Sequence, residues 1–129
     1  MLVSDGVLFT TSAWNVVYAI DARKGTVLWR HDPQVPTDDG KFVCCDVVNR
    51  GVALYHDKVY VGTIDGRLVA LDRRTGTQVW TAQTTPKDGP YSITGASAGH
   101  CAGYGSALPR PGGSAIRTQY CRPSPAIFA

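Results

Sequence analysis

The sequence predicts an all-β fold, and three observations support that prediction. Short runs of alternating apolar residues recur through the first 96 positions and are separated by turn residues such as Asp and Gly. One frame of residues occurs twice. No segment has the 3.6-residue periodicity of an amphipathic helix.

The repeated frame is Ala-x-Asp-x-x-x-Gly-Thr-x-x-Trp, found in VVYAIDARKGTVLWR (16–30) and, 51 residues later, in RLVALDRRTGTQVWT (67–81). In each copy the alternating residues predict a strand, Asp accepts backbone hydrogen bonds at the turn, and Gly supplies the positive φ that reverses the chain. The next strand carries Trp, which we expect to pack between repeats as a large apolar side chain. The matched positions are Asp21 and Asp72, Gly25 and Gly76, and Trp29 and Trp80.

Further strands precede each copy. VLFTTS (7–12) precedes the first, and GVALY (51–55) and KVYVGT (58–63) precede the second, with a hairpin tip near His56. The second unit therefore has four short antiparallel strands, the size of one propeller blade, and the first is the last three strands of another. Residues 1–96 are predicted to form about one and three-quarter four-stranded blades of a β-propeller, fewer than the three or so repeats of a stable array.

Composition and charge exclude several classes of partner. The net charge is +3, and Lys and Arg are interleaved with Asp, so no basic stripe for nucleic acid or an anionic membrane is present. No apolar run approaches the roughly 20 residues of a spanning helix. Met1 leads directly into LVSDGVLF, so no export signal is visible in the sequence.

Two adjacent cysteines, Cys44 and Cys45, leave three interpretations open on the residues alone. Consecutive α-carbons lie about 3.8 Å apart, below the usual disulfide range, so a bond between them requires a strained eight-membered ring. Such strain usually accompanies function. The alternatives are two reduced thiols on opposite faces of a strand, or part of a zinc site, for which no other ligand stands at a suitable spacing.

The repeat frame resembles the tryptophan-docking motif of pyrroloquinoline quinone (PQQ) repeats. The run CCDVVNRGVALYHDKVYVGTIDGRLVALD (44–72), followed by PYSITGA (90–96), closely resembles quinoprotein alcohol dehydrogenases, which are eight-bladed propellers. The resemblance covers about residues 7–96. It joins a repeat frame, a rare cysteine pair and a second motif in the expected order.

The resemblance implies four cofactor-binding residues. Cys44 and Cys45 match a family disulfide ring that lies against one face of the quinone. Arg50 matches an arginine that hydrogen-bonds the cofactor, where a planar guanidinium suits an anionic quinone with several carboxylates. Thr94 matches a threonine that donates to a cofactor carboxylate. Asp46 and Asn49 are expected only to brace the loop through hydrogen bonds to backbone.

The implied activity is oxidation of primary or secondary alcohols with PQQ and a bound calcium ion. The catalytic Asp and the calcium ligands would lie outside this chain, so no catalytic or metal-binding residue is predicted here. Electrons would pass to a cytochrome c or a quinone, with heme c in a further domain as one option, and the full-length protein would be periplasmic. We expect the isolated chain to be inactive. Two alternatives are a non-enzymatic PQQ-repeat scaffold and a membrane-bound sugar or polyol dehydrogenase, the latter disfavoured by the cysteine pair.

The composition changes abruptly at Ser97. Residues 97–129 contain no Asp, Glu or Lys and are rich in Gly, Ala, Pro, Ser and Arg. We therefore expect a disordered tail outside the family, produced by a shift of reading frame near Ser97. His100, Cys101 and Cys121 are then expected to have no inherited role.

Overall fold

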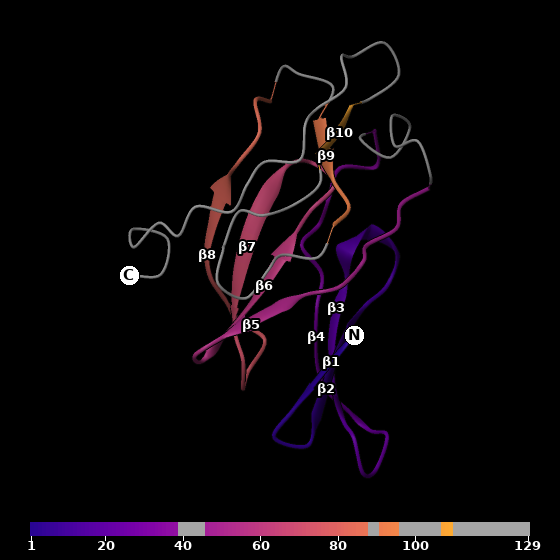
Figure 1. Cartoon of the computed structure of the whole chain (residues 1–129), viewed down its shortest axis with the longest axis vertical. Helices are drawn as coiled ribbons and strands as arrows, with labels where there is room; N and C mark the ends of the chain where they lie inside the picture. Colours follow the sequence, from indigo (N-terminus) through magenta and orange to yellow (C-terminus); the bar gives the residue numbers. More distant parts are fainter. Residues whose placement is uncertain (39–45, 88–90, 96–106, 110–129) are drawn as a thin grey trace.

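The computed structural model describes residues 1–38, 46–87 and 91–95, and the backbone of 107–109. Figure 1 shows two groups of strands, each a four-stranded antiparallel sheet in sequence order. The first sheet consists of β1 (Leu2–Ser4), β2 (Val7–Thr11), β3 (Val17–Asp21) and β4 (Val27–His31). The second consists of β5 (Ala53–Tyr55), β6 (Lys58–Gly62), β7 (Arg67–Asp72) and β8 (Gln78–Gln83). The all-β prediction is confirmed.

The first sheet has four strands, whereas the sequence led us to expect three. Leu2–Ser4 pairs antiparallel with β2 across a turn made by Asp5 and Gly6, both at positive φ (52° and 75°). An Asp-Gly pair in this conformation is a common two-residue hairpin turn. The strand was missed because its three residues are too few to show alternation, although the Asp-Gly signal was present in the sequence.

The turns that follow β3 and β7 have the predicted construction. The Asp21 carboxylate accepts hydrogen bonds from the backbone N–H groups two and three residues later, at 2.8 and 3.0 Å. The Asp72 carboxylate accepts the two equivalent bonds at the same distances. Gly25 and Gly76 stand at φ 73° and 72°. The backbone hydrogen bonds to Asp72 lower the pKa of its carboxyl group. Asp and Gly therefore serve as turn residues in both repeats.

The two sheets pack face to face around a shared apolar core. The buried members are Phe9, Val17 and Ala19 from the first sheet and, from the second sheet and the residue before it, Val52, Val59, Val61, Val69 and Leu71. Trp29 lies at this junction. Its indole Nε1 donates to the carbonyl of Arg73 at 3.0 Å, and a Cβ on Gly76 would come within 2.5 Å of its ring. The predicted packing of Trp29 between repeats is confirmed.

Trp80 occupies the corresponding place in the second sheet. Its ring lies 5.9 Å from that of Tyr60, as Trp29 lies 6.1 Å from Phe9. Both sheets also change register at the same step, between Ala19 and Ile20 and between Ala70 and Leu71. Within the described residues, no further turn of the repeated frame packs on Trp80.

Three short elements complete the described chain. A single 3-10 turn spans Ala13–Asn15, and β9 (Tyr91–Ile93) pairs antiparallel with β10 (Ala107–Pro109). A strand in the segment 97–129 was not expected from its composition. Strand pairing uses backbone groups, so three residues can pair without an alternating pattern. The rest of that segment lies outside the described residues.

Candidate functional site

The loop before β5 carries one of the four predicted cofactor-binding residues, Arg50, and its own side chains brace it. Asp46 accepts a hydrogen bond from the N–H of Val47 at 2.7 Å. Asn49 accepts one from the N–H of Gly51 at 2.8 Å, and Gly51 has a φ of 125°. The bracing role predicted for Asp46 and Asn49 is confirmed.

One backbone carbonyl, that of Gly62 at the end of β6, joins this loop to both sheets. It accepts a hydrogen bond from the Asn49 amide at 2.9 Å and another from the Asn15 amide at 3.2 Å. Asn15 is fully buried, and its oxygen accepts the N–H of Ile64 at 3.0 Å. Because both the donor and the acceptor of this buried amide are satisfied, it fixes the position of the first sheet relative to the second. Sequence reasoning missed Asn15, because its partners lie 47 and 49 residues away.

The structure brings together Arg50 and Thr94, two of the residues that the resemblance assigns to the cofactor. The N–H of Arg50 donates to the carbonyl of Thr94 at 3.0 Å. Thr94 follows β9, and the preceding Ile93 packs so closely on Gly62 that a Cβ there would meet its Cγ2 at 2.6 Å. The glycine therefore permits β9 to approach the end of β6.

The polar atoms of this pair fit an anionic ligand. Thr94 is 1% exposed, and its hydroxyl has no hydrogen-bond partner. A buried hydroxyl in this state carries a free-energy cost of about 1–3 kcal/mol, which a ligand acceptor would relieve. Arg50 is exposed, and its guanidinium pairs with no side chain in the described ranges. In the described ranges, the Thr94 hydroxyl and the Arg50 guanidinium therefore each keep hydrogen-bonding capacity for a ligand.

Cys44 and Cys45 lie outside the described residues. They directly precede Asp46 in the sequence. Their pairing as a disulfide stays a prediction.

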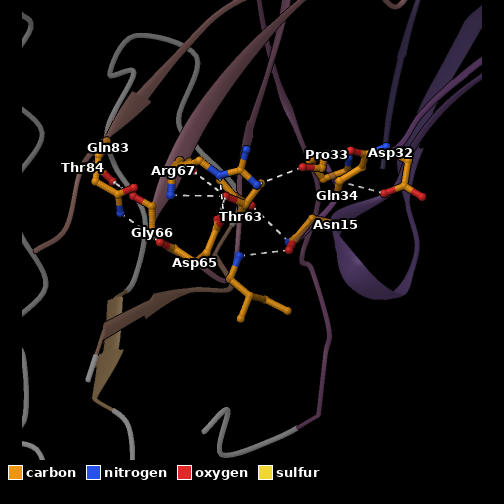
Figure 2. A network of polar contacts seen from close by, with 12 residues as sticks. Asn15, Asp32, Pro33, Gln34, Thr63, Asp65, Gly66, Arg67, Gln83 and Thr84 are labelled. Atoms are coloured by element: carbon orange, nitrogen blue, oxygen red, sulfur yellow. Dashed lines mark hydrogen bonds and ion pairs between the residues drawn. The ribbon is translucent and has the colours of Figure 1, made fainter. Parts of the chain in front are cut away.

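A polar network fixes the chain that leaves β4, and Figure 2 shows it. Arg67 reaches back from β7, donating to the Asp65 carboxylate at 2.6 Å and to the carbonyl of Pro33 at 2.9 Å. Thr63 donates to the other oxygen of Asp65. The Arg67 and Asp65 side chains are 24% and 14% exposed, so water screens this pair only partly. The network ties the segment after β4 to the second sheet.

His31, at the end of β4, has a buried Nε2 without a hydrogen-bond partner. Burial lowers the pKa of its imidazole, and Asp32 and the backbone of Gly76 oppose that shift. The neutral imidazole is therefore favoured near pH 7. This residue lies at the junction of the sheets, and we assign it no ligand role.

A hollow of about 910 Å³ lies elsewhere, beside Trp29 and Arg73, and does not include Arg50 or Thr94. Its lining mixes apolar side chains with charges of both signs: Asp5, Val7, Phe9, Leu28, Trp29, His56, Asp57, Asp72, Arg73 and Arg74.

In the part of the chain that the structure describes, no three His, Cys, Asp or Glu residues gather as metal ligands. The same part contains no helix long and apolar enough to cross a membrane.

Comparison with known proteins identifies the family. Residues 1–89 match the PQQ family described as glucose/ethanol/alcohol dehydrogenase, beta-propeller domain. A 1-butanol dehydrogenase (cytochrome c) of Thauera butanivorans is 56% identical over 96 residues, which is 74% of this chain and 14% of that protein. The present chain thus spans about one seventh of the length of this relative.

Solved structures give the same result. The quinohemoprotein alcohol dehydrogenase of Comamonas testosteroni matches with a TM-score of 0.71 and 49% identity, over 75% of this chain and 15% of that one. BamB of Moraxella catarrhalis matches less well, with a TM-score of 0.56 and 27% identity over 74% of this chain and 29% of that one. The chain belongs to the PQQ β-propeller family of glucose, ethanol and alcohol dehydrogenases.

Proposed function

We propose that this chain supplies one wall of the PQQ site of an alcohol-oxidising quinoprotein. The observation that carries the proposal is the buried, unpartnered hydroxyl of Thr94, held beside Arg50 by a backbone hydrogen bond. The proposal is supported by the sequence resemblance, in which both residues match cofactor-contacting positions of the family. Because the chain spans about 14% of its relative, the activity of a whole enzyme is part of the proposal.

Each residue has a distinct task in this proposal. Thr94 donates one hydrogen bond to a carboxylate of the cofactor, which fixes orientation. Arg50 supplies positive charge and a planar pair of donors to the anionic ring system. Cys44 and Cys45, joined as a disulfide ring, cover one face of the quinone with a rigid sulfur surface. When bound, PQQ would act as the oxidant of the alcohol.

The remaining parts of the enzyme would come from outside this chain. These are the catalytic base, the calcium ligands and a path for electrons to a cytochrome c or a quinone, with heme c in a further domain as one option. We place the full-length protein in the periplasm, because a disulfide between adjacent cysteines needs an oxidising compartment. The substrate would be a primary or secondary alcohol.

A scaffold of the BamB type is the weaker interpretation. BamB matches this chain at lower identity and lower structural similarity than the alcohol dehydrogenase does. A scaffold also gives no reason for the adjacent cysteines or for an unpartnered hydroxyl at the end of β9. The two interpretations differ in whether the chain recognises PQQ.

The test is an absorbance titration of the purified chain with PQQ and calcium, followed by an assay of alcohol oxidation. We expect weak binding and no turnover. Thr94→Val and Arg50→Gln should each weaken binding about tenfold, the energy of one charge-assisted hydrogen bond. Thr94→Ser, which keeps the hydroxyl, and Arg23→Gln, which removes one exposed charge elsewhere, should bind as the parent does.

Equal binding by all four variants would contradict the assigned contacts. Robust alcohol oxidation by the isolated chain would contradict its incompleteness. The cysteine pair has a separate test. After expression in an oxidising compartment, peptide mass mapping should find Cys44 and Cys45 in one peptide that is two hydrogens lighter than the dithiol.

A further inference from the structure

The carbonyl of Gly62 accepts two side-chain amides at the end of β6. Pairing of β5 with β6 begins with Ala53 opposite Tyr60, so the last residues of β6 extend beyond β5. There the amides of Asn15 and Asn49 donate to the Gly62 carbonyl at 3.2 and 2.9 Å. A carbonyl oxygen has two lone pairs, and these two bonds account for both. We call this carbonyl with its two amide donors the Gly62 hub.

The first sheet also holds the loop 46–51 directly. Thr11 Oγ1, at the end of β2, donates to the carbonyl of Asn49 at 3.4 Å. Trp14 N–H, in the 3-10 turn, donates to the carbonyl of Val47 at 3.1 Å. Both donors belong to the segment that leads into Asn15. The position of this loop is therefore set from the neighbouring sheet.

The 3-10 turn that carries Asn15 has an unusual backbone. Trp14 and Asn15 both have a φ of 61°. Asn tolerates this left-handed region, whereas a bulky residue such as Trp rarely adopts it, because the conformation is strained. Strain of this kind persists only where other contacts hold it. Here those contacts are the Trp14 bond to Val47 and the two hydrogen bonds of the Asn15 side chain.

The Gly62 hub also contacts the two residues assigned to the cofactor. Asn49 directly precedes Arg50, whose N–H donates to the Thr94 carbonyl at 3.0 Å. Ile93, the residue before Thr94, packs against Gly62 so closely that a Cβ there would lie 2.6 Å from its Cγ2. A shift of the Gly62 carbonyl would therefore displace Arg50 through Asn49, and Thr94 through Ile93.

We propose that Asn15 is a positioning residue for Arg50 and Thr94, although it belongs to the other sheet. Asn15 is fully buried, so it acts through the Gly62 carbonyl and not by contact with a ligand. This inference rests on the proposed function, which assigns Arg50 and Thr94 to the cofactor. The neighbouring repeat thus sets the geometry of the wall that the second repeat presents to PQQ.

A titration of the full chain with PQQ in the presence of calcium tests the proposal. Asn15→Ala should weaken PQQ binding about threefold to tenfold, since up to one of the two ligand hydrogen bonds is lost. The matched control is Val59→Ala, which truncates a buried side chain of the shared core at the opposite end of β6. Urea unfolding verifies that the two variants are destabilised to a similar extent. Val59→Ala should bind PQQ as the parent does.

A double-mutant cycle separates positioning from a general loss of stability. In a chain that already carries Thr94→Val, Asn15→Ala should weaken PQQ binding less than it does in the parent, because one of the donors that it positions is gone. Losses that simply add would overturn the proposal. Asn15→Asp keeps the acceptor for Ile64 N–H and loses the amide donor to Gly62. It should weaken binding as Asn15→Ala does, and it replaces that variant if circular dichroism shows the alanine variant to be unfolded.

Hydrogen exchange of the Arg50 amide is a second measurement and needs no cofactor. Because this N–H bonds the Thr94 carbonyl, it should exchange at least about fivefold faster in Asn15→Ala than in Val59→Ala. Equal exchange in the two variants, or PQQ binding by Asn15→Ala as strong as that of the parent, would overturn the proposal. A parent chain that does not bind PQQ would instead refute the proposed function, and Arg50 exchange would still decide whether Asn15 holds the pair.

Discussion

Replacing Trp29 tests how the two sheets are held together. Trp29→Ala removes the indole that covers Gly76, its hydrogen bond to Arg73 and its contact with the Phe9 ring. Truncating a large aromatic side chain in a core costs about 3–5 kcal/mol, and Trp29 is partly buried, so we expect a loss of about 3 kcal/mol. Trp29→Phe keeps a ring and loses the N–H donor, and should cost about 1 kcal/mol.

Urea unfolding followed by circular dichroism gives these losses, at concentrations low enough for the chain to be monomeric. Trp80→Ala is the matched control, because Trp80 occupies the same position in the frame and contacts Tyr60 but, among the residues that the structure describes, no turn of another sheet. Losing that ring contact should cost about 1 kcal/mol. If Trp80→Ala destabilises the chain as much as Trp29→Ala, the docking of Trp29 on Gly76 is not what holds the sheets together.

Three further predictions concern the junction and the loop. Burial lowers the pKa of His31 below its ordinary 6.5, so the unfolded chain binds a proton at higher pH than the folded chain. The free energy of unfolding should therefore fall as pH drops below about 6.5, and urea midpoints of His31→Gln should lack that part of the pH dependence. Asn49→Ala should cost about 1–2 kcal/mol, because the N–H of Gly51 loses its acceptor, and hydrogen exchange should show a less protected loop; unchanged exchange would contradict the bracing role. Arg67→Met should cost about 1–3 kcal/mol, because the Pro33 carbonyl and one oxygen of the Asp65 carboxylate lose their donor, and urea unfolding would detect it; a loss within about 0.5 kcal/mol would show that solvent replaces both bonds.

The strands and turns could be predicted because their causes are local. The alternation of apolar residues predicted β6 and β7, and the Asp-x-x-x-Gly spacing predicted the turn at Gly76. The turn could be predicted because the residues that make it lie within five positions of one another. The strand β1 was not predicted, because three residues are too few to show an alternating pattern. Its turn was still encoded, in Asp5 and Gly6.

The contacts between sheets could not be predicted, because their causes are distant. Nothing near Asn15 in the sequence shows that its amide will meet Gly62, or that its own φ will be 61°. Arg67 could equally have been a solvated cation, and only the fold brings Pro33 within 2.9 Å. The assignment of Arg50 and Thr94 as cofactor contacts came from the family resemblance, and no pattern in the residues predicted the hydrogen bond between them.

The length of chain between the partners at the junction has a consequence for the order of folding. Every ladder within the two four-stranded sheets joins neighbouring strands through short connections, so each of these sheets can form from local contacts. The contacts between sheets instead join residues 44 to 49 positions apart, in the bonds of Trp29 and Asn15. Closing such loops has an entropic cost that must be met before the apolar core forms. We expect each sheet to form rapidly and separately, with their docking as the slow step, so that Asn15→Ala would accelerate unfolding and leave the refolding rate nearly unchanged.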